Sequence, residues 1–373
     1  MPVHYHLGRF PPEGMDLERL VPLIGRAHAA LAAYNALLVA IPNPSVLLSP
    51  LVTQEAVLSS KIEGTHATVG EVLEFEADLE TSTFERAKRN DIEEIRNYRM
   101  ALSTMAKSLT ERPLSQQLLR EAHAMLMQGV RGQGKSPGAY RSRQNWIGPE
   151  GGRLEDASFV PIAPEHLAAG MDAWTSYLLD ERQLDPIVQL AVAHVEFEAL
   201  HPFEDGNGRL GRMIIPLYLY ARGLLRSPDF YMSGYFDRNH DAYVARLRAV
   251  SSNDAWNDWC AYFLDGVIRQ ATANERKARA ILELYERCKN DVVDLTHSQY
   301  AVRTVDFLFQ YPIFASPHLA EASGIPTRAT AMRILRLLRE AGLVRTIRPG
   351  RGRRSGIFAF PELLNLAEGE DAF

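Results

Sequence analysis

The chain has 373 residues, of which 46% are hydrophobic and 23% charged, so it can bury a large core, divided among two or three domains. Its two cysteines, Cys260 and Cys288, stand far apart without C-x-x-C spacing, which argues against a disulfide framework and a zinc site. No basic stretch and apolar run open the chain, and no segment has the ~18 uninterrupted apolar residues of a membrane span. We expect a soluble protein in a reducing cytoplasm, without a membrane partner.

Helical periodicity dominates the first third of the chain, which predicts a mostly α fold. A Pro-rich loop at residues 41–45 separates the first two expected helices. These helices form a predicted N-terminal helical region over residues 1–110. The expected helices cover residues 17–40, 52–80 and 83–109.

A second predicted segment, residues 111–270, opens with an amphipathic helix over 115–127 and a Gly-rich stretch over 129–138. Residues 140–148 then read as one arm of a β-hairpin, with Phe159-Val-Pro161 as the other arm. Glycines and acidic residues would form the tip between them. The sequence therefore predicts a small hairpin in an otherwise helical core.

The most informative stretch joins two apolar helices around residue 200. Asp185 followed by proline favours a helix start, and residues 187–200 are apolar on nearly every face. His201 would end this helix. Pro202-Phe-Glu-Asp-Gly-Asn-Gly-Arg-Leu-Gly-Arg212 follows it and opens a second helix, whose apolar run covers 213–220.

These residue types at this spacing predict a phosphate site with a base beside it. A Gly-Asn-Gly turn at a helix N-terminus directs backbone N–H groups and the positive end of the helix dipole at an anion. Arg209 and Arg212 lie one turn apart and can reach the same polyphosphate. Asp205 offers the single carboxylate that Mg²⁺ needs beside phosphate ligands. His201, with an ordinary pKa near 6.5, is a candidate general base.

The segment His201-Pro-Phe-Glu-Asp-Gly-Asn-Gly-Arg-Leu-Gly-Arg212 resembles the complete signature of Fic-domain proteins. The resemblance implies a Fic-type helical core with a hairpin flap that holds a target segment by strand addition. It also implies a protein adenylyltransferase, in which His201 takes the proton from a Ser, Thr or Tyr hydroxyl that attacks the α-phosphorus of ATP. ATP would be the co-substrate and Mg²⁺ the cofactor. Self-modification and a homodimer are further possibilities.

The same resemblance assigns roles around the nucleotide. Asp205 would hold Mg²⁺, Arg209 would neutralise the leaving group, and Arg212 would hold the γ-phosphate. Gly208 leaves room for the β-phosphate, where relatives that phosphorylate their targets carry lysine. Tyr243, in a segment similar to the family's adenine side, would contact the base or ribose, although an aromatic residue at that spacing can equally belong to the core. The expected nucleotide-binding residues are Asp205, Gly206, Asn207, Gly208, Arg209, Leu210, Gly211, Arg212 and Tyr243.

Upstream, Ser59-Ser-Lys-Ile-Glu63-Gly64 resembles the inhibitory motif of self-regulated Fic proteins, the class II arrangement with an N-terminal inhibitory helix. The resemblance implies that Glu63 pairs with Arg212 and takes the guanidinium that the γ-phosphate needs. The same glutamate could instead position a water that removes AMP from a modified target. The sequence leaves both roles open.

A basic block follows a linker helix predicted over residues 271–297. Between Tyr300 and Phe360 stand ten arginines and three acidic residues, so this segment carries about +7 against −5 for the whole chain. Helices over 299–310, 316–323 and 327–341 and a hairpin over 343–360, with its tip at 349–354, resemble a winged helix-turn-helix over residues 298–373. Its third helix would offer arginines to DNA, or the fold would serve dimerisation or protein docking.

Two other classes of function remain as alternatives. A DNA-binding regulator could use the Fic core to sense nucleotide without transferring it, although binding alone would not require His201. A metal-dependent hydrolase is disfavoured because the chain has no H-E-x-x-H or other multi-histidine ligand set. His194 lies two turns before His201 and reads as a core residue.

Overall fold

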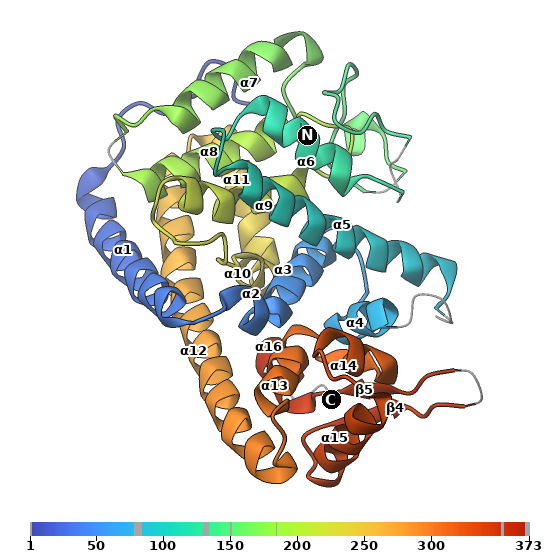
Figure 1. The fold of residues 1–373 in the computed structure, drawn as a ribbon. Helices are drawn as coiled ribbons and strands as arrows, with labels where there is room; N and C mark the ends of the chain where they lie inside the picture. Colours follow the sequence, from blue (N-terminus) through green and yellow to red (C-terminus); the bar gives the residue numbers. More distant parts are fainter. Residues whose placement is uncertain are drawn as a thin grey trace. The chain divides into compact units, whose positions relative to one another are not determined.

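A computed structural model of the chain describes residues 2–77, 84–129, 134–149, 151–183, 185–351 and 354–369. Helices dominate, which confirms the predicted mostly α fold (Figure 1). The chain divides into two compact units, each assembled from separate stretches of sequence. The first, which we call the motif unit, comprises Met1–Asn35, Leu58–Gly64 and Asn97–Thr272; the second, the C-terminal unit, comprises Ala36–Val57, Thr65–Arg96 and Ala273–Phe373. The predicted division into segments 1–110, 111–270, 271–297 and 298–373 follows chain order, whereas each compact unit combines stretches that are separate in the sequence.

The motif unit is built around α8, which packs against both α7 and α9 (Figure 1). Two short parallel strands, β1 and β2, pair beside these helices, with Val3 opposite Phe159. The elements of this unit are β1 (Val3–His4), α6 (Gln116–Leu126), a 3-10 turn (Leu154–Asp156), β2 (Phe159–Val160), α7 (Pro164–Leu179), α8 (Pro186–Leu200), α9 (Asn207–Ala221), α10 (Ser233–Arg238) and α11 (His240–Asn253).

Four helices begin in one unit and end in the other: α1 (Leu17–Ala40), α3 (Ser49–Ile62), α5 (Arg86–Ser108) and α12 (Trp256–Thr296). Among the described residues, α1 alone is long and apolar enough to cross a membrane by length and composition. Leu20, Ala27, Leu31 and Tyr34 are nevertheless fully or almost fully buried at helical spacing. This pattern is that of a helix with one face packed on a protein core.

The C-terminal unit contains a three-stranded antiparallel sheet in the order β3-β5-β4. Helix α4 packs against β3, and α2 packs against α13. From residue 301 to residue 359, the described elements follow the order helix, strand, helix, helix and two strands. The elements of this unit are α2 (Pro44–Leu47), α4 (Val69–Ala77), α13 (Ala301–Gln310), β3 (Ile313–Ala315), α14 (Ser316–Ala322), α15 (Arg328–Glu340), β4 (Arg345–Arg348), β5 (Ile357–Ala359) and α16 (Pro361–Glu368).

One long predicted helix is wrong. Residues 52–80 were expected to be continuous, but α3 ends at Ile62 and α4 begins at Val69. Gly64 adopts a φ of 91°, and this left-handed conformation ends the first helix in a turn. The apolar periodicity alone does not indicate this turn. Several predicted features lie wholly or partly outside the described residues. They are the end of this helix at residues 78–80, the expected helix start at Thr83, and parts of the Gly-rich stretch, of both hairpin tips and of the C-terminus.

The predicted hairpin arms of the motif unit do meet. Ile147 pairs antiparallel with Phe159, and its N–H donates to the Phe159 carbonyl at 2.9 Å. The other side of Phe159 faces β1, which the sequence did not predict as a strand. The N-terminal strand therefore occupies one edge of the hairpin, and the arm around Ile147 is its outer edge.

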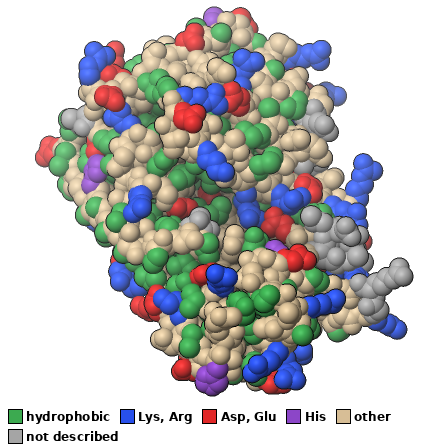
Figure 2. Space-filling model, viewed as in Figure 1, with side chains coloured by type: hydrophobic (Ala, Val, Ile, Leu, Met, Phe, Trp, Pro, Cys, Tyr) green, Lys and Arg blue, Asp and Glu red, His purple; other side chains and the backbone are tan. Residues whose placement is uncertain are grey.

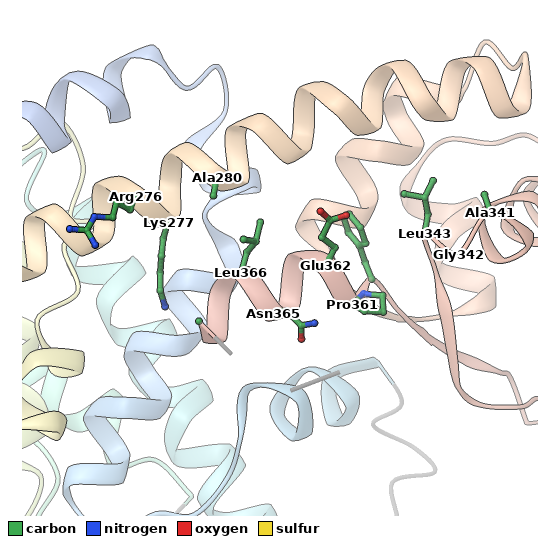
Figure 3. A pocket seen from close by; sticks show the side chains of 12 residues that line it. Arg276, Lys277, Ala280, Ala341, Gly342, Leu343, Pro361, Glu362, Asn365 and Leu366 are labelled. Carbon is green, nitrogen blue, oxygen red and sulfur yellow. The ribbon is translucent and has the colours of Figure 1, made fainter. Parts of the chain in front are cut away.

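A cavity of about 780 Å³ lies inside the C-terminal unit, between α12 and α16 (Figure 3). Arg276, Lys277 and Ala280 approach it from α12, and Glu362 and Asn365 approach it from α16. None of its lining residues belongs to the His201–Arg212 segment. The candidate site must therefore be built from the motif itself rather than from this cavity.

Candidate functional site

The site lies where α8 ends and α9 begins. The Asp185 side chain caps α8 by accepting from the N–H groups of Ile187 and Val188 at 2.9 and 3.0 Å. The helix is buried on nearly every face and ends at His201, whose φ of 47° is left-handed. This turn points the chain back toward α9, which begins at Asn207. The whole motif thus forms a tight connection between two core helices.

His201 is half-buried, and the last turn of α8 orients its ring. Nδ1 lies 3.3 Å from the Glu198 carbonyl oxygen, which can only accept, so Nδ1 carries the proton and Nε2 holds the lone pair. Burial lowers the pKa of His201 to about 4, and the Arg141 charge acts in the same direction. The imidazole is therefore neutral at pH 7, which is the form that a general base requires.

The loop after His201 is braced from inside. Asn207 Oδ1 accepts from the Phe203 N–H, and Asn207 Nδ2 donates to the Phe203 carbonyl, both at 2.9 Å. Gly206 adopts a φ of 76°, and a Cβ at this position would lie 2.9 Å from Met127 Sδ. The Asn207 side chain therefore stabilises the loop, and Gly206 permits the turn and the close approach of Met127.

Charged groups gather at this loop. Asp205 Oδ2 lies 3.0 Å from Lys135 Nζ, and Asp205 Oδ1 lies 3.8 Å from the Arg209 guanidinium. Burial alone would raise the pKa of Asp205, but Lys135, Arg209 and the Gly206 N–H keep it below its usual range. Asp205 is thus an ionised carboxylate beside cations, next to the positive N-terminus of α9.

Arg212 is the most completely buried charge of the motif, at 1% exposed. Its Nε donates to Ser59 Oγ at 3.0 Å, and one terminal nitrogen donates to the Ser59 carbonyl at 2.8 Å and to Glu63 Oε1 at 2.7 Å. Burial opposes ionisation of Glu63, but Arg212, Arg209 and His201 hold its pKa below the ordinary range. The pair predicted from sequence, Glu63 with Arg212, is present as a charged, hydrogen-bonded contact.

Gly208 makes this pairing possible. A Cβ at this position would lie 2.2 Å from Glu63 Oε1 and 2.9 Å from an Arg212 terminal nitrogen. Any side chain here would force Glu63 away. Gly208 therefore leaves room for the Glu63 carboxylate, in the place where the sequence analysis expected a phosphate.

Comparisons with known proteins identify the family of the domains that hold these residues. Residues 21–105 match the Fic/DOC family N-terminal region, and residues 113–219 match the Fic/DOC family. The chain belongs to the Fic/DOC family. Over 105 residues it is 31% identical to a probable protein adenylyltransferase of Aquifex aeolicus, covering 27% of this chain and 30% of that one. Over 115 residues it is 33% identical to protein adenylyltransferase fic-1 of Caenorhabditis briggsae, covering 30% and 21%.

The chain thus matches less than a third of the length of these curated relatives. Solved Fic structures extend the likeness of fold. A Fic family protein from Desulfovibrio desulfuricans superposes with a TM-score of 0.60 at 19% identity, covering 94% of this chain and 98% of that one. Fic-1 from Caenorhabditis elegans superposes with a TM-score of 0.52 at 20% identity, covering 71% and 73%.

Two residues that the sequence did not single out support the connection between α8 and α9. His123 Nδ1 accepts from the Gly138 N–H at 2.8 Å, and His123 Nε2–H donates to the Asp205 carbonyl at 2.9 Å. The ring stacks on Phe203 with centroids 3.8 Å apart. Burial lowers the pKa of His123 to about 4, so the neutral ring ties the Gly-rich stretch to the Asp205 backbone.

Arg141 is the second missed residue. Its Nε donates to the His201 carbonyl at 2.9 Å, and a terminal nitrogen donates to the Leu200 carbonyl at 3.2 Å. These are carbonyls that the end of α8 leaves without helical partners. The sequence placed Arg141 only in a hairpin arm, because no local pattern reveals a cap supplied from about 60 residues away.

Tyr243 occupies the core in this structure. It is 3% exposed, stacks on Phe236 with centroids 4.3 Å apart, and its hydroxyl lies 2.9 Å from His194 Nε2. Burial keeps the pKa of His194 near 3, so that ring is neutral and its role as a core residue agrees with the sequence interpretation. Tyr243 presents almost no surface to a base or ribose here, so its geometry does not favour the expected contact.

The two remaining predicted nucleotide-binding residues, Leu210 and Gly211, are also buried. Leu210 is completely inaccessible and packs in the core, so only its backbone belongs to the first turn of α9. Gly211 leaves room for the Glu198 carboxylate, because a Cβ there would lie 2.2 Å from Glu198 Oε1. Of the predicted nucleotide-binding side chains, Asp205, Arg209 and Arg212 carry the charge that a nucleotide would meet.

Proposed function

We propose that the protein transfers AMP from ATP to a hydroxyl group of a target protein, and that Glu63 restrains this activity. The orientation of His201 carries the proposal. Its Nδ1–H donates to the Glu198 carbonyl, so Nε2 is unprotonated and can accept a proton. A neutral base beside a helix N-terminus with two arginines suits phosphoryl chemistry. The names of the curated relatives support the same activity.

In the proposed reaction, the target hydroxyl oxygen attacks the α-phosphorus of ATP. A bond forms between that oxygen and phosphorus, the bond to pyrophosphate breaks, and the hydroxyl proton passes to His201 Nε2. Arg209 and the first N–H groups of α9 stabilise the negative charge of the phosphates. Arg212 binds the γ-phosphate once Glu63 has released it.

Asp205 suits Mg²⁺ as the cofactor. Its ionised carboxylate already faces a cation, Lys135, at 3.0 Å. The described residues contain no cluster of three or more acidic, histidine or cysteine side chains, which accords with an ion that takes most of its ligands from phosphates and water. When bound, Mg²⁺ would supply charge neutralisation at the α- and β-phosphates.

Restraint by Glu63 rests on competition for one guanidinium. Glu63 Oε1 and the Ser59 carbonyl share the same terminal nitrogen of Arg212. A γ-phosphate would need that nitrogen and would place negative charge beside the Glu63 carboxylate. ATP would therefore bind in an unproductive position until Glu63 moves.

Mass spectrometry of the purified protein after incubation with ATP and Mg²⁺ tests the proposal. Glu63→Gly should accumulate AMP adducts far faster than the wild type, and Glu63→Gly/His201→Ala should form none. Glu13→Gly, a substitution of an exposed loop glutamate, is the matched control and should behave like the wild type. Equal adduct formation with and without Glu63 would reject the restraint.

The other activities left open by the sequence give different outcomes. If Glu63 positions a water for AMP removal, the wild type should release AMP from a pre-modified protein while Glu63→Gly does not. If the Fic core only senses nucleotide, ATP should bind Glu63→Gly without any adduct on the protein or on a lysate. Gel filtration in the same series tests for the homodimer.

A second proposed function is nucleic-acid binding by the C-terminal unit. Helix α15 exposes Arg328, Arg333, Arg336 and Arg339 on one side, while Ala331, Ile334, Leu335 and Leu338 form its buried side. Figure 2 shows basic side chains grouped at the lower edge of the face it presents. Exposed arginines on the third helix of such a fold suit contacts with phosphates in a DNA groove.

Binding to a double-stranded DNA of mixed sequence, measured by fluorescence anisotropy across a salt series, tests this second proposal. Arg333→Ala/Arg336→Ala should weaken binding and reduce the slope of log affinity against log salt by about 0.9 for each lost phosphate contact. Arg279→Ala, an exposed arginine of α12, is the control. No binding by the wild type at low salt would favour protein docking instead.

A further inference from the structure

Two carboxylates lie side by side on the glycine face of α9. Gly208 and Gly211 are three residues apart, so they occupy the same face of the helix. A Cβ at Gly208 would lie 2.2 Å from Glu63 Oε1, and a Cβ at Gly211 would lie 2.2 Å from Glu198 Oε1. The two acidic groups therefore cover adjacent turns of the helix that carries Arg212.

Glu198 differs from Glu63 in its partners. Glu63 is hydrogen-bonded to Arg212, whereas Glu198 Oε1 is buried and has no hydrogen-bond partner among the described residues. A solvent-excluded carboxylate oxygen without a partner is costly, and a bound water, ion or ligand, or a catalytic role, is a common reason for a protein to retain one. The reaction proposed above makes no use of this side chain.

Three titratable groups act on Glu198, each from a different part of the motif unit. Arg212 approaches from α9, Glu63 follows α3, and Tyr243 comes from α11. Burial raises the pKa of Glu198 to about 7; Arg212 opposes this rise and the Glu63 carboxylate adds to it. Near neutral pH, Glu198 is thus divided between its charged and neutral forms, whereas Glu63 is ionised.

We propose that Glu198 is a ligand of the terminal phosphate of the nucleotide, which it meets as a neutral carboxylic acid when that phosphate replaces Glu63 at Arg212. The O–H group of Glu198 then donates to a phosphate oxygen, and its other oxygen remains an acceptor for Arg212. This inference rests on the proposed use of ATP. It adds a residue from the end of α8 to the phosphate site.

The acid has to be neutral for an electrostatic reason. A γ-phosphate carries more negative charge than the carboxylate it displaces, so an ionised Glu198 beside it would be repelled. A protonated Glu198 gains a hydrogen bond to a charged acceptor instead. Binding of ATP well above pH 7 must therefore take up close to one proton, and this uptake falls as the pH drops below 7, where more of Glu198 is already protonated.

Isothermal titration calorimetry of Glu63→Gly tests this, with a non-hydrolysable α,β-methylene ATP analogue and Mg²⁺ between pH 6 and 9. Loss of the Glu63 charge lowers the Glu198 pKa. Affinity should therefore fall more than tenfold between pH 7 and pH 8.5. Glu63→Gly/Glu198→Gln should remove most of this fall, because the amide donates a hydrogen bond at every pH. Glu63→Gly/Glu165→Gln, changed at an exposed glutamate of α7, should keep it.

Two further measurements separate a phosphate ligand from a merely structural residue. ADP, which lacks the terminal phosphate, should bind both Glu63→Gly and Glu63→Gly/Glu198→Gln with the same pH dependence. Calorimetry in buffers of different ionisation enthalpy measures the number of protons taken up on binding. Glu63→Gly, in which Glu198 is intact, should take up about one proton per analogue bound at pH 8.5.

An identical pH dependence in the parent and the Glu198→Gln variant, or no proton uptake, would overturn the role of Glu198 while leaving ATP use intact. An equal effect of Glu198→Gln on ADP would assign it a structural role and also overturn the proposal. Failure of Glu63→Gly to bind any adenine nucleotide would instead reject the proposed function, and this inference with it.

Discussion

At the scale of single residues, the site depends on side chains whose protonation is set by burial. His201 and His123 both have a pKa near 4, so each is neutral at pH 7 with a defined tautomer. His201 keeps Nε2 available for a proton, whereas both nitrogens of His123 hold backbone groups of the loop. The same residue type therefore serves as a candidate base at one position and as a brace at the other.

The depressed pKa of His201 predicts an unusual pH profile. A group whose pKa is lowered by folding stays neutral until the pH falls toward that value, so the base should remain competent from pH 8 down to about pH 5. In Glu63→Gly the pKa should be lower still, because Glu63 raises it. Single-turnover rates with saturating ATP and Mg²⁺ should stay within about twofold over this range. A tenfold loss between pH 7 and pH 5.5 would indicate an ordinary histidine.

Gly208 offers a second test at this scale. Gly→Ala inside a helix normally stabilises by roughly 0.5–1 kcal/mol. Here the added Cβ would fall 2.2 Å from Glu63 Oε1, so Gly208→Ala should instead lose about 1–2 kcal/mol in the wild type. In the Glu63→Gly background this clash is absent and only the 2.9 Å approach to an Arg212 terminal nitrogen remains, so most of the loss should disappear. Thermal unfolding of the four proteins measures the coupling, and a loss of the same size in both backgrounds would contradict it.

At the scale of elements, the position of His201 depends on how α8 begins and ends. Asp185 caps the start through two N–H groups and also lies 2.6 Å from His28 Nε2 of α1, while Arg141 collects the carbonyls at the end. The helix between is buried on nearly every face, so burial stabilises it but does not fix its length or register. The caps decide where His201 leaves the helix.

The cap predicts a modest, specific loss of stability. Asp185→Ala removes both cap hydrogen bonds and should destabilise the protein by about 1 kcal/mol. Asp185→Asn retains a cap acceptor and should recover most of that loss, although the ionic part of the contact with His28 goes. The midpoint of chemical unfolding, followed by the fluorescence of Trp174, which donates to a carbonyl of α8, reports the change. Equal midpoints for Asp185→Ala and the wild type would show that the cap contributes nothing.

At the scale of the whole molecule, the basic C-terminal segment does not pack as a separate domain. Its helices and strands pack on segments from the first hundred residues: α2 packs on α13 and α4 packs on β3. Gln54 of α3 donates to the Glu368 carbonyl at 3.0 Å and accepts from Lys277 at 2.8 Å. The C-terminal unit is therefore completed by early parts of the chain.

Truncation after residue 297 tests this interleaving. A detachable domain would leave the remainder as stable as before, but here α2 and α4 would lose α13 and β3 and expose apolar surface. The truncated chain should unfold at a lower temperature than the full chain and should aggregate on gel filtration. Limited proteolysis should cut it within residues 36–57 or 65–96. A truncated monomer that melts with the full chain would show that the C-terminal segment is independent.

The amino-acid sequence by itself determined the helical class and the join of two helices at His201, through local periodicity and helix start signals. The pairing of Glu63 with Arg212 came from the resemblance of residues 59–64 to the inhibitory motif of self-regulated Fic proteins, and the structure contains this contact. Only the tertiary structure decided the break between α3 and α4, the strand β1 beside the hairpin, and the roles of His123, Arg141 and Glu198. Each of these depends on contacts between residues far apart in the chain, where the energy of packing and of buried hydrogen bonds outweighs local preference. The tertiary structure also places Tyr243 in the core, where the family resemblance had suggested a nucleotide contact and a core position was the alternative.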